Sequence, residues 1–142
     1  MLCYKKKEMS EKKINILYVE DDDGHALLMK LNLTDLKIDY SLKIFRYSDE
    51  LFSFLNQNYT NRSIYFILLD IRLPKHNGLT ILKMLKESYN FKNINVIIVS
   101  SSDNPEEIKQ AFDGGAIEFY KKPVNFEKLK KLIISNTKNF KK

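Results

Sequence analysis

The chain has 142 residues, of which 44% are hydrophobic and 30% charged, the balance of one soluble globular domain. No apolar run approaches the roughly 18 residues of a membrane helix, and the N-terminus lacks the apolar stretch of a signal peptide. These features exclude a membrane or secreted protein, and we expect a cytoplasmic one. Cys3 is the only cysteine, which excludes an internal disulfide.

The net charge is +6, and much of the positive excess lies at the two ends of the chain. We predict a basic N-terminal tail over residues 1–13, one domain over residues 14–138 and a basic C-terminal tail over residues 139–142. Lysines clustered at chain ends are usually solvated, so we expect no specific nucleic-acid binding. The same charges would attract the acidic surface of a protein partner.

Five short apolar runs are predicted to be β-strands. They are Ile14–Val19, Leu42–Phe45, Ile64–Leu69, Ile94–Val99 and Ile117–Tyr120. The third run and most of the fourth are apolar on both faces, which is typical of central parallel strands covered by helices on both sides. Run length and β-branching favour strand over buried helix.

Helical patterns separate these runs, each with apolar residues on one face. The five faces consist of Leu27, Leu28 and Leu31; Leu51, Phe52 and Leu55; Leu79, Leu82 and Leu85; Ile108, Ala111 and Phe112; and Leu129, Leu132 and Ile133. Capping residues mark the helix starts. Asp23 is placed to cap the first helix, Asn104 followed by Pro105 the fourth, and Asn125 the fifth.

Five strands that alternate with five helices predict right-handed βαβ units. We expect an α/β fold of the flavodoxin-like doubly wound type, (βα)5, with a five-stranded parallel sheet in the order 2-1-3-4-5 and helices on both faces. Other doubly wound orders are compatible with the same alternation. Ligands of such sheets bind at the carboxyl ends of the strands, so the residues after each strand form the candidate site.

Acidic, hydroxyl or lysine side chains follow four of the five predicted strands, whereas the second is followed by Arg46 and Tyr47, which carry no comparable chemistry. Glu20 and Asp21 follow the first, Asp70 the third, Ser100 the fourth and Lys122 the fifth. These four strands are neighbours in the expected order, so their ends would surround one crevice. Asp70 directly follows six apolar residues, where a carboxylate is unfavourable unless a metal ion or hydrogen bonds stabilise it.

Three carboxylates around one crevice repel one another. At about 4 Å and an effective dielectric constant near 20, each pair costs on the order of 4 kcal/mol, so either a proton is retained or a cation is bound. Oxygen-only ligands suit a hard cation, and Mg²⁺ binds to few carboxylates plus waters. We therefore expect Mg²⁺ as the cofactor.

These residues resemble the response regulator receiver domain family in their order, spacing and surroundings. The matching features are Glu20-Asp21, the segment LLDIRLPKHNGL over Leu68–Leu79, Ser100 and Lys122-Pro123. The resemblance extends over nearly the whole chain. The segments around Asp70 and after Ser100 look most like the small single-domain regulators that accompany bacteriophytochromes and other hybrid sensor kinases.

The resemblance implies that Asp70 is a phospho-acceptor for a sensor histidine kinase or a histidine phosphotransfer protein. It implies that Mg²⁺ is bound by Asp21, Asp70, the backbone carbonyl of Arg72 and, through water, Glu20. Glu20 stands where the family often has Asp. The protein would itself be the substrate, so the family implies a signalling domain and not a turnover enzyme.

The resemblance also implies a set of switch residues. Ser100 matches the switching hydroxyl, and Lys122 matches the lysine that meets the phosphoryl oxygens. The neighbouring Lys121 could match the same family position, and we choose Lys122 because it precedes Pro123. Phe119 stands at the aromatic switch position, where tyrosine is frequent, and plain core packing is the other interpretation of this residue.

Output is expected by contact with a downstream protein through the fourth helix, the fifth strand and the fifth helix. The sequence does not decide whether the chain forms a homodimer through that face.

Three other functions are alternatives to the receiver function. A flavin or nucleotide module of the same fold would need a phosphate-binding loop after strand 1, where acidic residues stand instead. A haloacid-dehalogenase-type phosphatase would need Asp where Arg72 stands. The remaining alternative is a pseudo-receiver that serves only as a binding scaffold, and the complete acid, serine and lysine set argues against it.

Overall fold

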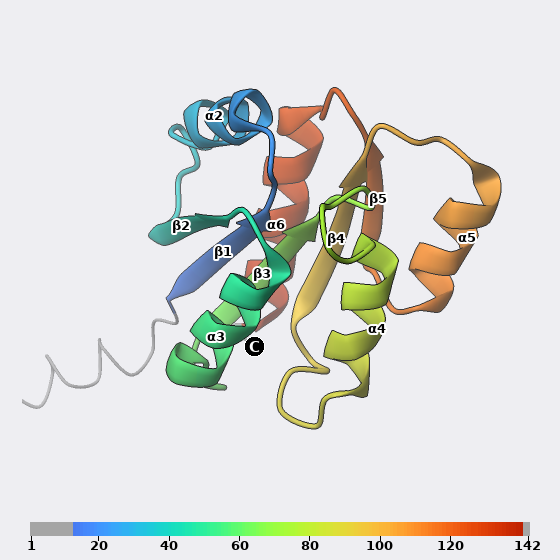
Figure 1. Cartoon of the computed structure of the whole chain (residues 1–142). Helices are drawn as coiled ribbons and strands as arrows, with labels where there is room; N and C mark the ends of the chain where they lie inside the picture. Colours follow the sequence, from blue (N-terminus) through green and yellow to red (C-terminus); the bar gives the residue numbers. More distant parts are fainter. Residues whose placement is uncertain (1–12, 141–142) are drawn as a thin grey trace, which may run out of the picture.

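A computed structural model describes residues 13–140 of the chain; residues 1–12 and 141–142, with Cys3 and parts of both predicted tails, lie outside the described residues. The elements in chain order are β1 (Ile14–Val19), α2 (Asp23–Asn32), β2 (Tyr40–Phe45), α3 (Ser48–Asn58), β3 (Ile64–Leu69), α4 (Gly78–Glu87), β4 (Asn95–Ser100), α5 (Pro105–Asp113), β5 (Glu118–Lys121) and α6 (Phe126–Phe140) (Figure 1). In the described part of the chain, no helix combines the length and the apolar character needed to cross a membrane.

The five strands form one parallel sheet in the order β2-β1-β3-β4-β5, which confirms the predicted flavodoxin-like topology. Strand β2 begins two residues earlier than predicted, and β4 and β5 are each displaced by one residue. The register aligns the carboxyl ends of three strands, because Val19 pairs with both Phe45 and Leu69. Ser100 pairs with Lys121 at the same edge of the sheet. The residues that follow these strands therefore start from one side of the molecule.

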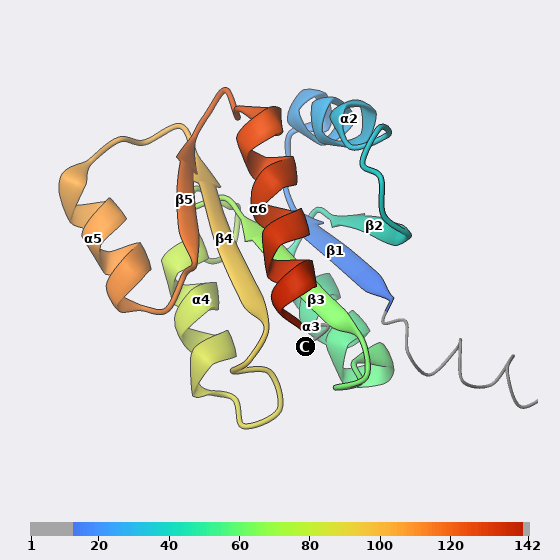
Figure 2. The ribbon, with the colours of Figure 1, turned by 180° about the vertical axis from the view of Figure 1, so that it is seen from behind.

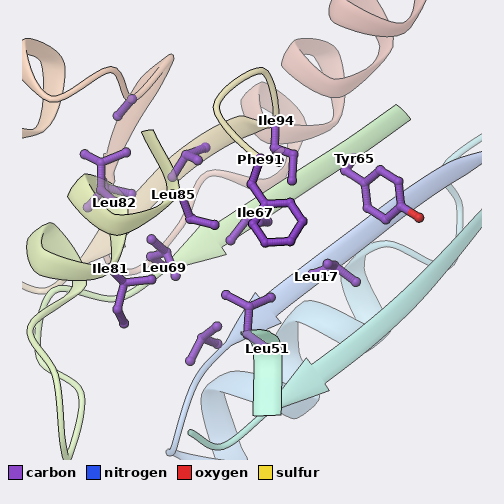
Figure 3. Packing of buried hydrophobic residues seen from close by; sticks show 14 of the residues in the cluster. Leu17, Leu51, Tyr65, Ile67, Leu69, Ile81, Leu82, Leu85, Phe91 and Ile94 are labelled. Atoms are coloured by element: carbon purple, nitrogen blue, oxygen red, sulfur yellow. The ribbon is translucent and has the colours of Figure 1, made fainter. Parts of the chain in front are cut away.

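The sheet divides the core into two apolar layers, because alternate strand residues point to opposite faces. Helices α2 and α6 cover one face, and α3, α4 and α5 cover the other (Figures 1 and 2). On the second face, Ile81, Leu82 and Leu85 of α4 pack toward the sheet residues Ile67 and Leu69 (Figure 3). Strand β3 is buried along its whole length, which explains its uninterrupted apolar sequence.

The predicted apolar face of the first helix is wrong. Leu27, Leu28 and Leu31 are each at least half exposed, and α2 packs on the sheet through Met29, with Leu33 just after the helix. All five residues are apolar, so the helical pattern does not distinguish the face that meets the sheet. The fourth helix shows a smaller departure, because Ala111 is buried while Phe112 is 45% exposed.

Helix starts follow the predicted capping chemistry with one correction. The side chain of Asn104 accepts the amide proton of Glu106, and the side chain of Asn125 accepts that of Lys128. Helix α2 is capped by Asp22 and not by Asp23, because the Asp22 side chain accepts a hydrogen bond from the amide of His25 at 2.8 Å. Asp23 is instead the first residue of the helix.

Candidate functional site

The side chains of Glu20, Asp70 and Lys122 meet at the carboxyl edge of the sheet. Each follows a different strand, β1, β3 or β5. Lys122 Nζ lies 2.6 Å from Glu20 Oε1 and 2.6 Å from Asp70 Oδ2. The amide of Lys122 also donates to the carbonyl of Ser100 at 2.7 Å, which attaches this residue to the end of β4. One ammonium group thus joins two acids that lie 50 positions apart in the sequence.

This bridge is almost completely shielded from solvent. The side chains of Glu20, Asp70 and Lys122 are 1%, 8% and 9% exposed. A buried charge is strongly unfavourable unless it is paired and hydrogen-bonded. Here one ammonium group faces two carboxylates, so the site keeps a formal negative charge that an additional cation would balance.

Glu20 is held by three donors. The hydroxyl of Tyr18 donates to Oε1 at 2.7 Å, the amide of Asp22 donates to Oε2 at 3.2 Å, and Lys122 completes the set. Burial by itself would raise the pKa of the Glu20 carboxyl, but the hydrogen bonds from Lys122 and Tyr18 outweigh it and lower this pKa below its ordinary value. Glu20 is therefore a carboxylate at neutral pH.

Lys122 and Tyr18 respond to the same surroundings. Burial alone would lower the pKa of Lys122, but its hydrogen bonds to Asp70 and Glu20 raise this pKa overall. Burial, together with the bond to Glu20, raises the pKa of the Tyr18 phenol. The tyrosine thus stays a neutral donor, and the lysine stays a cation.

Asp70 uses both of its carboxylate oxygens. Oδ2 accepts from Lys122, and Oδ1 accepts from the backbone amide of Arg72 at 3.0 Å. The peptide that follows Asp70 packs tightly against the start of α4, since a Cβ atom added to Gly78 would lie 2.2 Å from the carbonyl oxygen of Asp70. Gly78 also donates its amide to the carbonyl of Ile71 at 2.9 Å. Only glycine permits this close approach, which sets the position of the Asp70 loop.

Asp21 lies less deeply than its neighbour Glu20. It lines an open hollow together with Arg72, Asn77 and Glu107. Its carbonyl accepts a hydrogen bond from Arg46 Nη1 at 2.8 Å. Residues from both segments that were predicted to bind a metal ion, the one after β1 and the one after β3, line this hollow.

The expected cluster of three carboxylates is not formed. Within residues 13–140 there is no group of three or more acidic, histidine or cysteine side chains placed to hold a metal ion. The ammonium group of Lys122, and not a metal ion, lies between Glu20 and Asp70. The donor chemistry nevertheless fits Mg²⁺, which needs only one or two carboxylates beside waters and substrate oxygens. Asp21, Asp70 and the carbonyl of Arg72 provide hard oxygen atoms of this kind.

The remaining predicted residues also lie near this edge. Ser100 is fully buried at the end of β4, and its Oγ accepts the amide of Ser102 at 3.2 Å. Phe119 is half-buried on β5 and packs against the core on the side of α3, α4 and α5. The side chain of Lys121 pairs with the exposed Asp103 at 3.0 Å. Of the two adjacent lysines, Lys122 is therefore the one that contacts Asp70.

Sequence reasoning missed three residues that contact this site. Tyr18 precedes Glu20 by two residues and shares its strand face, which is a signal that could have identified it. Arg46 follows β2 beside β1, and its Nη2 also donates to Asp23 Oδ1. His25 contacts Lys122 at 3.0 Å. No sequence pattern indicated this contact, because it depends on how α2 lies next to the loop that follows β5.

The chain is similar to known signalling proteins. A family model described as "Response regulator receiver domain" matches residues 16–134. The probable methanogenesis regulatory protein FilR2 of Methanothrix harundinacea (strain 6Ac) is 28% identical over 120 residues, which cover 83% of this chain and 77% of that protein. The chain spans about half, or less, of the length of the plant two-component response regulators that it also matches.

Two solved structures extend the comparison to the fold. The Mn²⁺-bound form of response regulator Rcp1 has a TM-score of 0.68 and 28% identity, over 85% of this chain and 89% of that one. The bacteriophytochrome response regulator RtBRR has a TM-score of 0.72 and 27% identity, over 87% of this chain and 76% of that one. The first of these is a neighbour with a divalent cation bound.

Proposed function

Because the chain belongs to the response regulator receiver domain family, as its sequence predicted, we propose that it accepts a phosphoryl group onto Asp70 from a sensor histidine kinase or a histidine phosphotransfer protein. The observation that supports this most directly is the buried bridge from Lys122 to Glu20 and Asp70. It provides an oriented carboxylate with a fixed cation beside it, which is suited to an incoming anion. We expect this role to be carried out in the cytoplasm.

In the transfer, an oxygen of Asp70 attacks the phosphorus atom of the donor's phosphohistidine. A phosphorus–oxygen bond forms as the phosphorus–nitrogen bond breaks, and the leaving imidazole nitrogen keeps the bonding electron pair and takes up a proton from water. Lys122 offsets negative charge on the phosphoryl oxygens. Water later hydrolyses the acyl phosphate and restores Asp70. The chain is itself the substrate, so this is a signalling domain and not a turnover enzyme.

The proposed metal site consists of Asp21, Asp70 and the backbone carbonyl of Arg72, with Glu20 acting through water. When bound, Mg²⁺ would offset the charge of the carboxylate and of the transferred group. The chain's own contribution is to hold the oxygens in place. Arg46 fixes the backbone of Asp21, and the amide of Arg72 orients Asp70.

Phosphorylation would be transmitted through new hydrogen bonds. Ser100 and Lys122 can each gain a bond to a phosphoryl oxygen, worth roughly 1.5–3 kcal/mol for a charged partner. Moving a two-state switch from 1:99 to 99:1 needs about 5.5 kcal/mol. Two bonds supply this free energy only if each is near its upper limit. We therefore expect phosphorylation to shift the conformational equilibrium partly, and binding of a downstream protein to complete the shift. The surface of α5, β5 and α6, next to Phe119, is the proposed output face.

The test is incubation of the full chain with acetyl phosphate and Mg²⁺, followed by intact-mass measurement. We expect a gain of one phosphoryl group that is acid-stable and base-labile, and that is lost when the metal is chelated. Asp70→Asn should abolish it. Asp103→Asn is the matched control, since Asp103 is an exposed acid at the same edge of the sheet, and it should keep the gain.

Two results would contradict the proposal in different ways. A mass gain that persists in Asp70→Asn would exclude Asp70 as the acceptor. A wild-type chain that shows no gain with acetyl phosphate or with a phosphorylated histidine phosphotransfer protein would favour the pseudo-receiver, which acts only as a binding scaffold.

A further inference from the structure

The ammonium group of Lys122 has three acceptors, and one of them has no role in the proposed transfer. Nζ lies 2.6 Å from Glu20 Oε1, 2.6 Å from Asp70 Oδ2 and 3.0 Å from His25 Nδ1. A lysine ammonium has three hydrogen-bond donors and no acceptor. The three contacts therefore use all of its hydrogens, and a further acceptor must replace one of these partners.

The contact assigns a role to one ring nitrogen of His25. Because Lys122 can only donate, Nδ1 is the acceptor in this hydrogen bond, which corresponds to the tautomer with its ring hydrogen on Nε2. The backbone near the ring is fixed as well, since the Asp22 side chain accepts the amide of His25 at 2.8 Å. His25 is thus held in the first turn of α2 with its acceptor nitrogen directed at the ammonium group.

The three acceptors differ in strength and in access to solvent. Glu20 and Asp70 are nearly fully buried carboxylates 2.6 Å from Nζ, whereas the side chain of His25 is 45% exposed and its Nδ1 lies 3.0 Å from Nζ. A bond from an ammonium group to a carboxylate joins two opposite charges and is shorter and stronger than a bond to an imidazole nitrogen. The bond to His25 is the weakest of the three and the one that an anion arriving from solvent can replace.

We propose that His25 is a positioning residue for Lys122, which holds the third N–H of the ammonium group in the unphosphorylated chain and yields it to an oxygen of the phosphoryl group. This inference rests on the proposed function, since it concerns how Lys122 meets that group. It follows that His25 competes with the phosphoryl group. A chain without an acceptor at this place binds a phosphoryl-shaped anion more tightly.

The experiment uses trifluoroberyllate, an anion with the shape of a phosphoryl group that binds a carboxylate oxygen without a transfer step. Wild type and variants are titrated with it in the presence of Mg²⁺, and the dissociation constant is read from amide chemical shifts. We expect His25→Leu to bind about two- to ten-fold more tightly, the effect of one ordinary hydrogen bond. His25→Asn, whose amide oxygen can take the place of Nδ1, should restore the wild-type constant.

A control variant and a second measurement separate this role from a merely structural one. Leu31→Asn changes an exposed residue of the same helix and should leave the dissociation constant unchanged. The two-bond proton–nitrogen spectrum of the histidine rings in wild type should show the Nε2–H form of His25 without the anion, and a changed Nδ1 signal at saturation.

The outcomes are distinguishable. A His25 ring that carries its proton on Nδ1 in the free chain would overturn the inference, and so would equal anion affinity in wild type, His25→Leu and His25→Asn. In both cases the phosphorylation of Asp70 would still stand. A wild-type chain that binds no anion and gains no phosphoryl mass would overturn the proposed function, and this inference with it.

Discussion

Lys122 shows how a single residue can serve both stability and chemistry. Its ammonium group pairs with two buried carboxylates, offsets one of their two negative charges, and at the same time lies beside the proposed acceptor oxygen. Without it, Glu20 and Asp70 would be two like charges in a poorly solvated pocket. Removing one partner of a buried ion pair costs much more than the pair itself contributes, because the other charge is left uncompensated.

We therefore expect Lys122→Met to lower the free energy of unfolding by about 3–5 kcal/mol. Lys121→Met is the matched control, because Lys121 is exposed and its partner Asp103 lies in solvent, so it should change stability little. Urea denaturation at pH 7 without divalent cations measures both. Similar losses in the two variants would show that the buried bridge contributes no special stability.

Glu20 makes the stability of the chain depend on pH at the acid end. In the folded chain its pKa lies below the ordinary value of 4.5, because Lys122 and Tyr18 stabilise the charged form more than burial destabilises it. A lowered folded-state pKa contributes stability that is fully present above about pH 4.5 and is lost as the pH falls through the folded value.

Glu20→Gln removes this contribution. Below about pH 4.5 the free energy of unfolding of the variant should fall less steeply with decreasing pH than that of the wild type. Urea denaturation at a series of pH values gives the two curves. If they run parallel through this range, Glu20 does not change its proton affinity on folding.

Among the elements, α4 packs directly against the loop that carries Asp70. Its first residue, Gly78, lies against the carbonyl of Asp70, where any Cβ would meet backbone atoms of Asp70 and Ile71. Backbone atoms cannot turn aside as a side chain can. A larger residue must push the start of α4 away from the loop that carries Asp70, so the helix position and the site are coupled.

We expect Gly78→Ala to destabilise the chain by about 1–3 kcal/mol, the usual effect of overpacking, and to slow phosphorylation by acetyl phosphate. Gly24→Ala is the control at the start of another helix. Its Cβ would meet only the side-chain oxygen of Asp22, at 3.1 Å, and alanine favours helix over glycine. Thermal unfolding compares the two variants, and an unchanged midpoint in Gly78→Ala would contradict the steric argument.

For the whole molecule, the central strand β3 joins two separate apolar layers. Phe66 and Leu68 face α2 and α6, while Ile67 and Leu69 face α3, α4 and α5. All four side chains are fully buried. Because one strand supplies both layers, a cavity on either side should weaken the entire fold in one cooperative transition.

Phe66→Ala should lower the free energy of unfolding by about 3–5 kcal/mol through lost burial and a residual cavity. Phe112→Ala removes the same side chain from a position that is 45% exposed and should have a much smaller effect. Urea denaturation followed by circular dichroism measures both. A second transition in Phe66→Ala would show that the two layers unfold independently.

The amino-acid sequence by itself determined the strands, their parallel direction and the set of polar residues at the strand ends, and it favoured the order 2-1-3-4-5 among several doubly wound ones. Those features follow from local periodicity, from the handedness of βαβ units and from the chain positions after each strand, none of which needs the coordinates. Glu20, Asp70 and Lys122 could thus be assigned to one edge of the sheet before their contacts were known.

Only the tertiary structure decided which side chains meet there. The α2 pattern contained more apolar residues than one face can bury, so packing selected Met29 and left Leu27, Leu28 and Leu31 exposed. Lys122, and not a third carboxylate, came to lie between Glu20 and Asp70, and His25 joined it from α2. These contacts join residues far apart in the chain, and their partners are set by how helix and sheet surfaces pack, which no local pattern encodes.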